Sequence, residues 1–174
     1  MAHPDMSAPI LMILALVLVS AWTDIRRRLI YDAFTFPAML AGVYFAMLAG
    51  PQPLAWSLAG LAGGLLVLYP FYRIGGMGFG DLKLMGAIGA LGGLTFLVSA
   101  FIDTALAGGV MAIALMARRG NSTEILGRSP QVLRAIFSRG GKVQMPDSKD
   151  QDTIPYGVAI FLGTVFAWLT HWPW

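Results

Sequence analysis

The sequence contains no cysteine and only two histidines, His3 and His171, among its 174 residues. The lack of cysteine excludes disulfide bonds, thiolate zinc sites and cysteine nucleophiles. Neither histidine has another histidine or cysteine at ligand spacing, so the sequence predicts no metal site. It also lacks the aromatic and groove-reading motifs of proteins that bind nucleic acids, and we therefore expect no nucleic-acid partner.

Charged residues are scarce as well. They make up 12% of the chain, whereas hydrophobic residues make up 57%, and the mean hydropathy is +0.69. A soluble domain has about 25% charged residues. The composition therefore predicts an integral membrane protein, a single all-α domain over residues 1–174, whose apolar surface faces lipid.

Six apolar segments are predicted to cross the membrane as a helix bundle: 8–23, 34–50, 54–73, 83–99, 104–117 and 155–172. Only three polar residues, within 99–104, interrupt the long apolar run there, and a continuous helix at this point would give five spans instead of six. The pairs Gly60/Gly64 and Gly89/Gly93 have G-x-x-x-G spacing, which predicts close packing of helix backbones.

The positions of the basic residues predict the orientation. With the N-terminus outside and six spans, all twelve lysines and arginines fall on one side, as the positive-inside rule requires. Both termini are then periplasmic, the first span is an uncleaved anchor, and residues 118–153 form a cytoplasmic loop. Within that loop, 129–137 fits either a basic amphipathic helix on the inner leaflet or a solvated connector.

Two aspartates stand out, because a carboxylate near membrane depth is costly and usually functional. Asp24 follows the first apolar run, and Asp81 closes the glycine-rich stretch 75–80. The predicted topology places both at the cytoplasmic ends of their spans, where two carboxylates can perform acid–base chemistry on one water. Structural interpretations remain for each: Asp24 pairs with a neighbouring arginine, or Asp81 caps the next helix.

Gly78 and Gly80 make the turn before Asp81 open, because they lack a Cβ and allow unusual backbone angles. A carboxylate on such a turn can approach a substrate backbone without obstruction. The phosphate-binding patterns G-x-x-x-x-G-K-[ST] and G-x-G-x-x-G are not matched. Lys83 either contacts substrate or lipid headgroups, or only anchors the helix end by its charge.

The sequence resembles the type IV prepilin peptidases, which belong to the GxGD class of intramembrane aspartic proteases. Gly78-Phe79-Gly80-Asp81 matches the class motif, and Asp24, with the arginines after it and Ile30, matches the first catalytic aspartate and its loop. Residues 154–160 resemble the motif that opens the last span of the family. The resemblance covers nearly the whole chain. It implies that both aspartates are catalytic. We expect Gly78 and Gly80 to lie beside the substrate, as would Lys83 if it contacts substrate rather than only anchoring the helix end.

Two departures from the family pattern matter. The family often has Ile-Pro-Asn where this chain has Ile30-Tyr31-Asp32, so Asp32 competes with Asp24 for the first catalytic position. The long form of the family also carries a cytoplasmic cysteine-rich segment associated with N-methylation. This chain has no cysteine and resembles the short form found with tight-adherence (Flp-type) pili, so we expect no methylation.

The resemblance implies a multi-pass enzyme of the inner membrane that removes the leader of prepilin-like substrates at the cytoplasmic border. It implies no cofactor. The partners that it implies are prepilin substrates and membrane lipid, and the pilus-assembly machinery is a further candidate partner. Two close carboxylates cannot easily both ionise, so the pair would share a proton. Alternatives are a preflagellin peptidase with the same chemistry, or a non-enzymatic transporter or secretion scaffold; the lack of an evident inverted repeat counts against a transporter.

Overall fold

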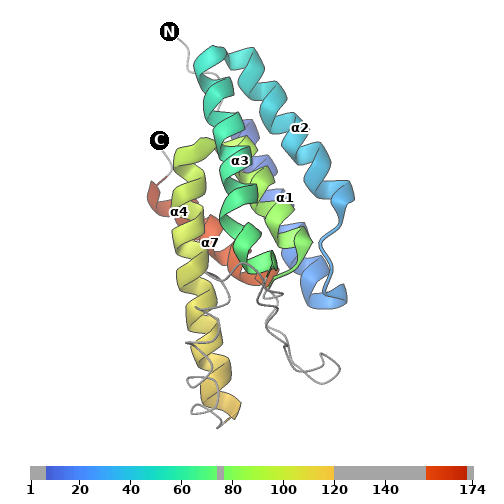
Figure 1. Cartoon of the computed structure of the whole chain (residues 1–174), viewed down its shortest axis with the longest axis vertical. Helices are drawn as coiled ribbons and strands as arrows, with labels where there is room; N and C mark the ends of the chain where they lie inside the picture. The colour runs from blue at the N-terminus through green and yellow to red at the C-terminus, as the bar shows by residue number, and fades with distance from the viewer. Residues whose placement is uncertain (1–6, 74–76, 120–155, 172–174) are drawn as a thin grey trace.

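The computed structural model describes residues 7–73, 77–119 and 156–171, and all regular secondary structure within them is helical. Figure 1 shows the helices packed side by side as a bundle. Four of them are long and apolar enough to cross a membrane, and the last is a shorter apolar helix. The predicted all-α membrane bundle is confirmed to this extent. The helices are α1 (Ser7–Arg27), α2 (Asp32–Ala49), α3 (Pro51–Arg73), α4 (Phe79–Arg119) and α7 (Tyr156–His171).

Helix α4 contains a reversal of the chain at Gly93. This residue has φ 76° and ψ 175°, a backbone conformation that favours glycine. Before the reversal, Gly89 packs against Gly60 of α3, and after it Leu97 lies against Gly63 of α3. The second part of α4 therefore runs back along α3 (Figure 1). The described residues therefore form six helical segments. Whether all six cross the membrane, and on which side the termini lie, stays a prediction.

The prediction of a turn within 99–104 is wrong. Residues 94–119 are helical, and Ser99 Oγ donates a hydrogen bond to a backbone carbonyl of the preceding turn at 3.5 Å. Asp103 and Thr104 are buried. These polar side chains interrupt the apolar run because they face the interior of the bundle, not because the chain meets water there. The turn requires a positive φ, which the glycine at 93 supplies.

The closest contact between helices is that of α3 with the first part of α4. A Cβ on Gly60 would overlap the backbone of Gly89, and one on Gly64 would lie 2.5 Å from the carbonyl oxygen of Met85. The predicted packing role is confirmed for Gly60, Gly64 and Gly89, whereas Gly93 instead forms the reversal of the chain. Ser57 Oγ adds a buried hydrogen bond of 2.7 Å to a carbonyl oxygen of α4, which joins the two helices where lipid supplies no hydrophobic drive.

One end of the bundle gathers the ends of α1 and α3 and the beginnings of α2, α4 and α7. A contact between the rings of Tyr72 and Phe79, 5.2 Å apart, joins α3 to α4 there. Several basic residues belong to the same end, in agreement with the one-sided charge distribution predicted from the sequence. They are Arg26, Arg27, Arg28, Arg73 and Lys83. The predicted loop 118–153 begins inside α4; the rest of it, with the predicted helix at 129–137, lies outside the described residues.

The reversal at Gly93 leads to a topology test. We expect reporter fusions at the N-terminus, at the C-terminus and after Gly50 to report the periplasm, because Gly50 joins α2 to α3 at the end opposite the basic residues. A fusion within 118–153 should report the cytoplasm. A cytoplasmic C-terminus would contradict six crossings and would mean that the two parts of α4 do not both span the bilayer.

Candidate active site

Asp81 lies in the first turn of α4 and is 8% exposed. The backbone N–H of Gly78, just before the helix, donates a hydrogen bond of 3.1 Å to Asp81 Oδ2. This is half of a capping box, in which the third helical residue satisfies the donor that precedes the helix. Capping by Asp81, one of the structural interpretations, is therefore observed. It uses one carboxylate oxygen and fixes the orientation of the other.

Asp24 lies near the end of α1 and is 9% exposed. Its Oδ2 accepts a buried hydrogen bond of 2.7 Å from the backbone N–H of Gly157, the second residue of α7. The first N–H groups of a helix have no partner within it, and the helix N-terminus favours a negative charge. A charge-assisted hydrogen bond of this kind contributes about 1.5–3 kcal/mol. Arg28 also acts electrostatically on Asp24, although less than the hydrogen bond from Gly157.

The structure brings the two predicted aspartates into one site. The charges of Asp24 and Asp81 act on one another, and the charge of Asp81 also reaches the phenol of Tyr156, the first residue of α7. Both carboxyl groups are buried at the same end of the bundle. Buried carboxyl groups that interact in this way can hold one proton between them and act as an acid and a base. Among the described residues no group of three or more acidic or histidine side chains has the arrangement of a metal site.

At two glycines of the site, Gly80 and Gly157, a side chain would collide with a neighbour, and at Gly78 it would make a tight contact. A Cβ on Gly80 would lie 2.8 Å from the Cβ of Ile30 in the connection between α1 and α2, and one on Gly157 would lie 2.8 Å from Asp24 Oδ2. A Cβ on Gly78 would lie 3.2 Å from Asp81 Oδ2. The two carboxylates are therefore approached by backbone rather than by side chains.

Asp32 and Lys83 form a pair beside this site. Lys83 Nζ lies 2.7 Å from Asp32 Oδ2, 4.5 Å from the ring centroid of Phe79 and 5.0 Å from that of Phe36. The side chain of Asp32 is 56% exposed, unlike the buried Asp24. The ion pair explains the position of Asp32 without a role beside Asp81. The predicted contact between Lys83 and substrate is not tested by these contacts.

The contribution of α7 is the part of the site that the residue pattern did not predict. The resemblance at 154–160 indicates the start of the last span but not the backbone N–H that it donates to Asp24. The available signal was a glycine at the second position of an apolar segment, next to Tyr156. A hydrogen bond from a backbone N–H leaves no other trace in the sequence.

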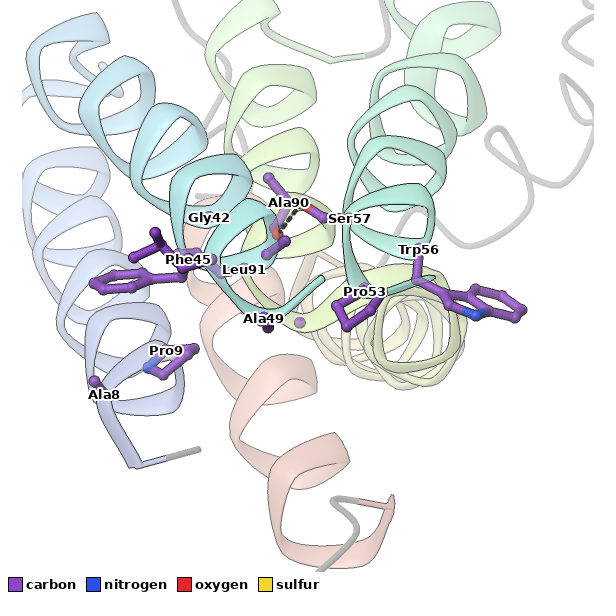
Figure 2. A pocket seen from close by; sticks show the side chains of 14 residues that line it. Ala8, Pro9, Gly42, Phe45, Ala49, Pro53, Trp56, Ser57, Ala90 and Leu91 are labelled. Carbon is purple, nitrogen blue, oxygen red and sulfur yellow. Dashed lines mark hydrogen bonds between the residues drawn. The ribbon is translucent and has the colours of Figure 1, made fainter. Parts of the chain in front are cut away.

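An apolar cavity of about 540 Å³ lies at the opposite end of the bundle (Figure 2). It is lined by the beginnings of α1 and α3, the end of α2 and the reversal in α4, with Trp56 and Phe45 among its side chains. Neither aspartate lines it. The cavity is therefore separate from the candidate active site.

Comparison with known proteins gives consistent results. The type IV leader peptidase family matches residues 11–113, which include both aspartates and the glycine turn. A prepilin leader peptidase/N-methyltransferase of Aeromonas salmonicida is 32% identical over 118 residues, 63% of this chain and 40% of that protein. The leader peptidase HopD of Escherichia coli is 34% identical over 66% of this chain and 79% of its own length. The HopD of Salmonella typhimurium is 33% identical over 71% of this chain and 86% of its own length. No solved structure matches the chain. The aligned region thus spans about two fifths of the Aeromonas protein and most of each HopD.

Proposed function

Because this chain belongs to the type IV leader peptidase family, we propose that it is an aspartic endopeptidase of the inner membrane that removes the leader of prepilin-like substrates. The observation that supports this most is the pair of buried, interacting carboxylates, Asp24 and Asp81, each held by a backbone N–H at a helix N-terminus. Their place at the basic end of the bundle favours cleavage at the cytoplasmic border.

The chemistry requires one proton between the two carboxyl groups. The ionised aspartate takes a proton from water as the water oxygen attacks the scissile carbonyl carbon, and the protonated aspartate donates a hydrogen bond to the carbonyl oxygen. The tetrahedral intermediate then collapses, the C–N bond breaks, and the leaving amine takes up a proton from the pair. Because Gly78 and Gly157 each hold one oxygen of a carboxylate, both side chains are oriented before substrate binds, which lowers the cost of alignment.

The substrate would approach as an extended chain along the glycine turn. Gly78 has no side chain beside Asp81, so the substrate backbone would approach the carboxylate there; at Gly80 the place of a side chain is taken by Ile30 of this chain. We propose Flp-type prepilins as the substrate class, because the chain resembles the short form of the family, which lacks the cysteine-rich segment and is found with Flp-type pili. We propose cleavage without methylation, because the chain resembles the form of the family that has no cysteine-rich segment.

Co-expression with candidate substrates tests this function. Membranes that contain the chain and an Flp-type prepilin should convert the prepilin to a shorter product, with the mass loss of the leader measured by mass spectrometry. A preflagellin offered in parallel tests the closest alternative. If no prepilin or preflagellin is shortened although the protein accumulates in the membrane, the peptidase proposal fails and a non-enzymatic role for the aspartate pair gains support.

Substitution of the turn glycines should suppress cleavage more than it lowers the protein level. Gly80→Val should have the larger effect, because its Cβ would collide with Ile30 and displace the turn that carries Asp81. Gly78→Val should also reduce cleavage, through crowding of the Asp81 carboxylate. The rate of leader removal per amount of protein is the measurement. Gly109→Val is the matched control, since nothing lies within 4 Å of its Cβ position; equal rates in all three variants would contradict a special role for the turn.

A further inference from the structure

The contacts of Lys83 point to a role that differs from substrate binding. Asp81 and Lys83 are two positions apart on α4, and side chains at that spacing do not face each other on a helix. The amine of Lys83 instead faces α2, where it meets Asp32 Oδ2 at 2.7 Å. The lysine next to the catalytic motif is thus directed toward a neighbouring helix and away from the carboxylate pair.

Three side chains surround the amine of Lys83, and together with the lysine they form what we call the clasp: Asp32, Phe36, Phe79 and Lys83. Each helix supplies two of them at i, i+4 spacing, so both members of each pair lie on one helix face. The two rings lie 4.5 and 5.0 Å from the amine, within the range of cation–π attraction. The Lys83 side chain is only 13% exposed and that of Asp32 is 56% exposed, so the lysine half of this ion pair is shielded from water while the aspartate half is not.

The clasp joins the segments that carry the two catalytic candidates. Asp24 lies just before the connection between α1 and α2, and Asp32 begins α2 directly after that connection. In the same connection Ile30 packs on Gly80, one residue before Asp81. The ion pair and the Ile30–Gly80 contact therefore fix this connection to the start of α4 at two adjacent points.

We propose that Lys83 and Asp32 are positioning residues, which hold the end of α1 next to the beginning of α4 so that the carboxylates of Asp24 and Asp81 lie close together. The role of the clasp in catalysis rests on the proposed function, whereas its effect on the distance between positions 24 and 81 does not. Loss of the ion pair leaves each carboxylate intact but allows the two helix ends to separate. A misplacement of about 1 Å at a reacting group can lower a rate about 100-fold.

A cross-linking experiment tests positioning without any cleavage. The chain has no cysteine, so Asp24→Cys/Asp81→Cys contains the only two thiols, and a short reagent that links two thiols reports how often they meet in the membrane. We expect Lys83→Gln to lower the cross-linking rate several-fold, Lys83→Arg to keep it, and Asp32→Lys/Lys83→Asp to restore part of it. Arg73→Gln removes an exposed charge at the same end of the bundle and should change nothing. An unchanged rate in Lys83→Gln would overturn the proposal.

Kinetic measurements on Lys83 variants that retain Asp24 and Asp81 then distinguish a positioning role of Lys83 from a contact with substrate. Lys83→Gln should lower kcat up to about 100-fold and leave KM nearly unchanged, with recovery in Lys83→Arg. A raised KM at constant kcat would show that Lys83 contacts substrate and would overturn the positioning role. If the unsubstituted chain cleaves no prepilin while cross-linking still depends on Lys83, the proposed function fails and the clasp stands.

Discussion

Asp24→Asn and Asp81→Asn should each abolish leader removal while the protein still accumulates in the membrane. Asparagine keeps the shape of the side chain and a carbonyl oxygen, which can still accept the hydrogen bonds from Gly157 and Gly78. It cannot hold the shared proton, so neither the activation of water nor the protonation of the leaving amine remains. Removal of a charge near membrane depth does not harm insertion. Immunoblots of membranes and the gel shift of the prepilin measure both quantities together.

The double variant distinguishes a catalytic unit from two independent sites. Residues that act as a unit are strongly non-additive, so Asp24→Asn/Asp81→Asn should be no worse than either single change. Asp32→Asn is the control for the competing assignment. It should retain cleavage, although weakened by the loss of the clasp. Loss of all cleavage in Asp32→Asn and Asp81→Asn, with activity kept in Asp24→Asn, would move the first catalytic role to Asp32.

Gly60→Ala and Gly89→Ala should lower the thermal stability of the purified protein in detergent, the second large effect that we expect. At both positions the added methyl group would overlap the backbone of the facing helix, so α3 and α4 must separate along their contact. Overpacking of this kind costs about 1–3 kcal/mol. The separation should also weaken the hydrogen bond from Ser57 to α4.

Gly109→Ala is the matched control for this measurement. It makes the same chemical change inside α4, at a position with no atom within 4 Å. Alanine has the higher helix propensity, so the midpoint of thermal unfolding should stay the same or rise. A fall in Gly109→Ala as large as that in Gly89→Ala would mean that any alanine in these helices is destabilising and that the close contact is not the cause.

The features of this molecule that could be predicted from sequence are those that depend on the type and spacing of particular residues. Asp24 and Asp81 were found because a carboxylate within an apolar chain is rare, and the glycines at 60, 64, 89 and 93 because their spacing has a packing meaning. The structure brings both aspartates together and places Gly60, Gly64 and Gly89 at the contact between α3 and α4, whereas Gly93 forms the reversal. The membrane class followed from composition alone.

The parts that could not be predicted depend on backbone or on distant pairing. Hydropathy cannot reveal a reversal at Gly93, because the chain is apolar on both sides of it. The polar residues Asp103 and Thr104 suggested a turn at the wrong position, because their side chains are buried in the bundle. The contact of Lys83 with Asp32 joins residues 51 positions apart, and no local pattern predicts it.

The hydrogen bond from Gly157 to Asp24 spans 133 positions of the chain, and this has a consequence for biosynthesis. A ribosome makes α1 early and α7 late, so during most of translation the Asp24 carboxylate has no partner from α7. The site is completed only when the last described helix enters the bundle. If the chain is the proposed peptidase, a nascent chain that has already inserted α1 to α4 should therefore be inactive, and cleavage should begin only after synthesis has passed residue 157.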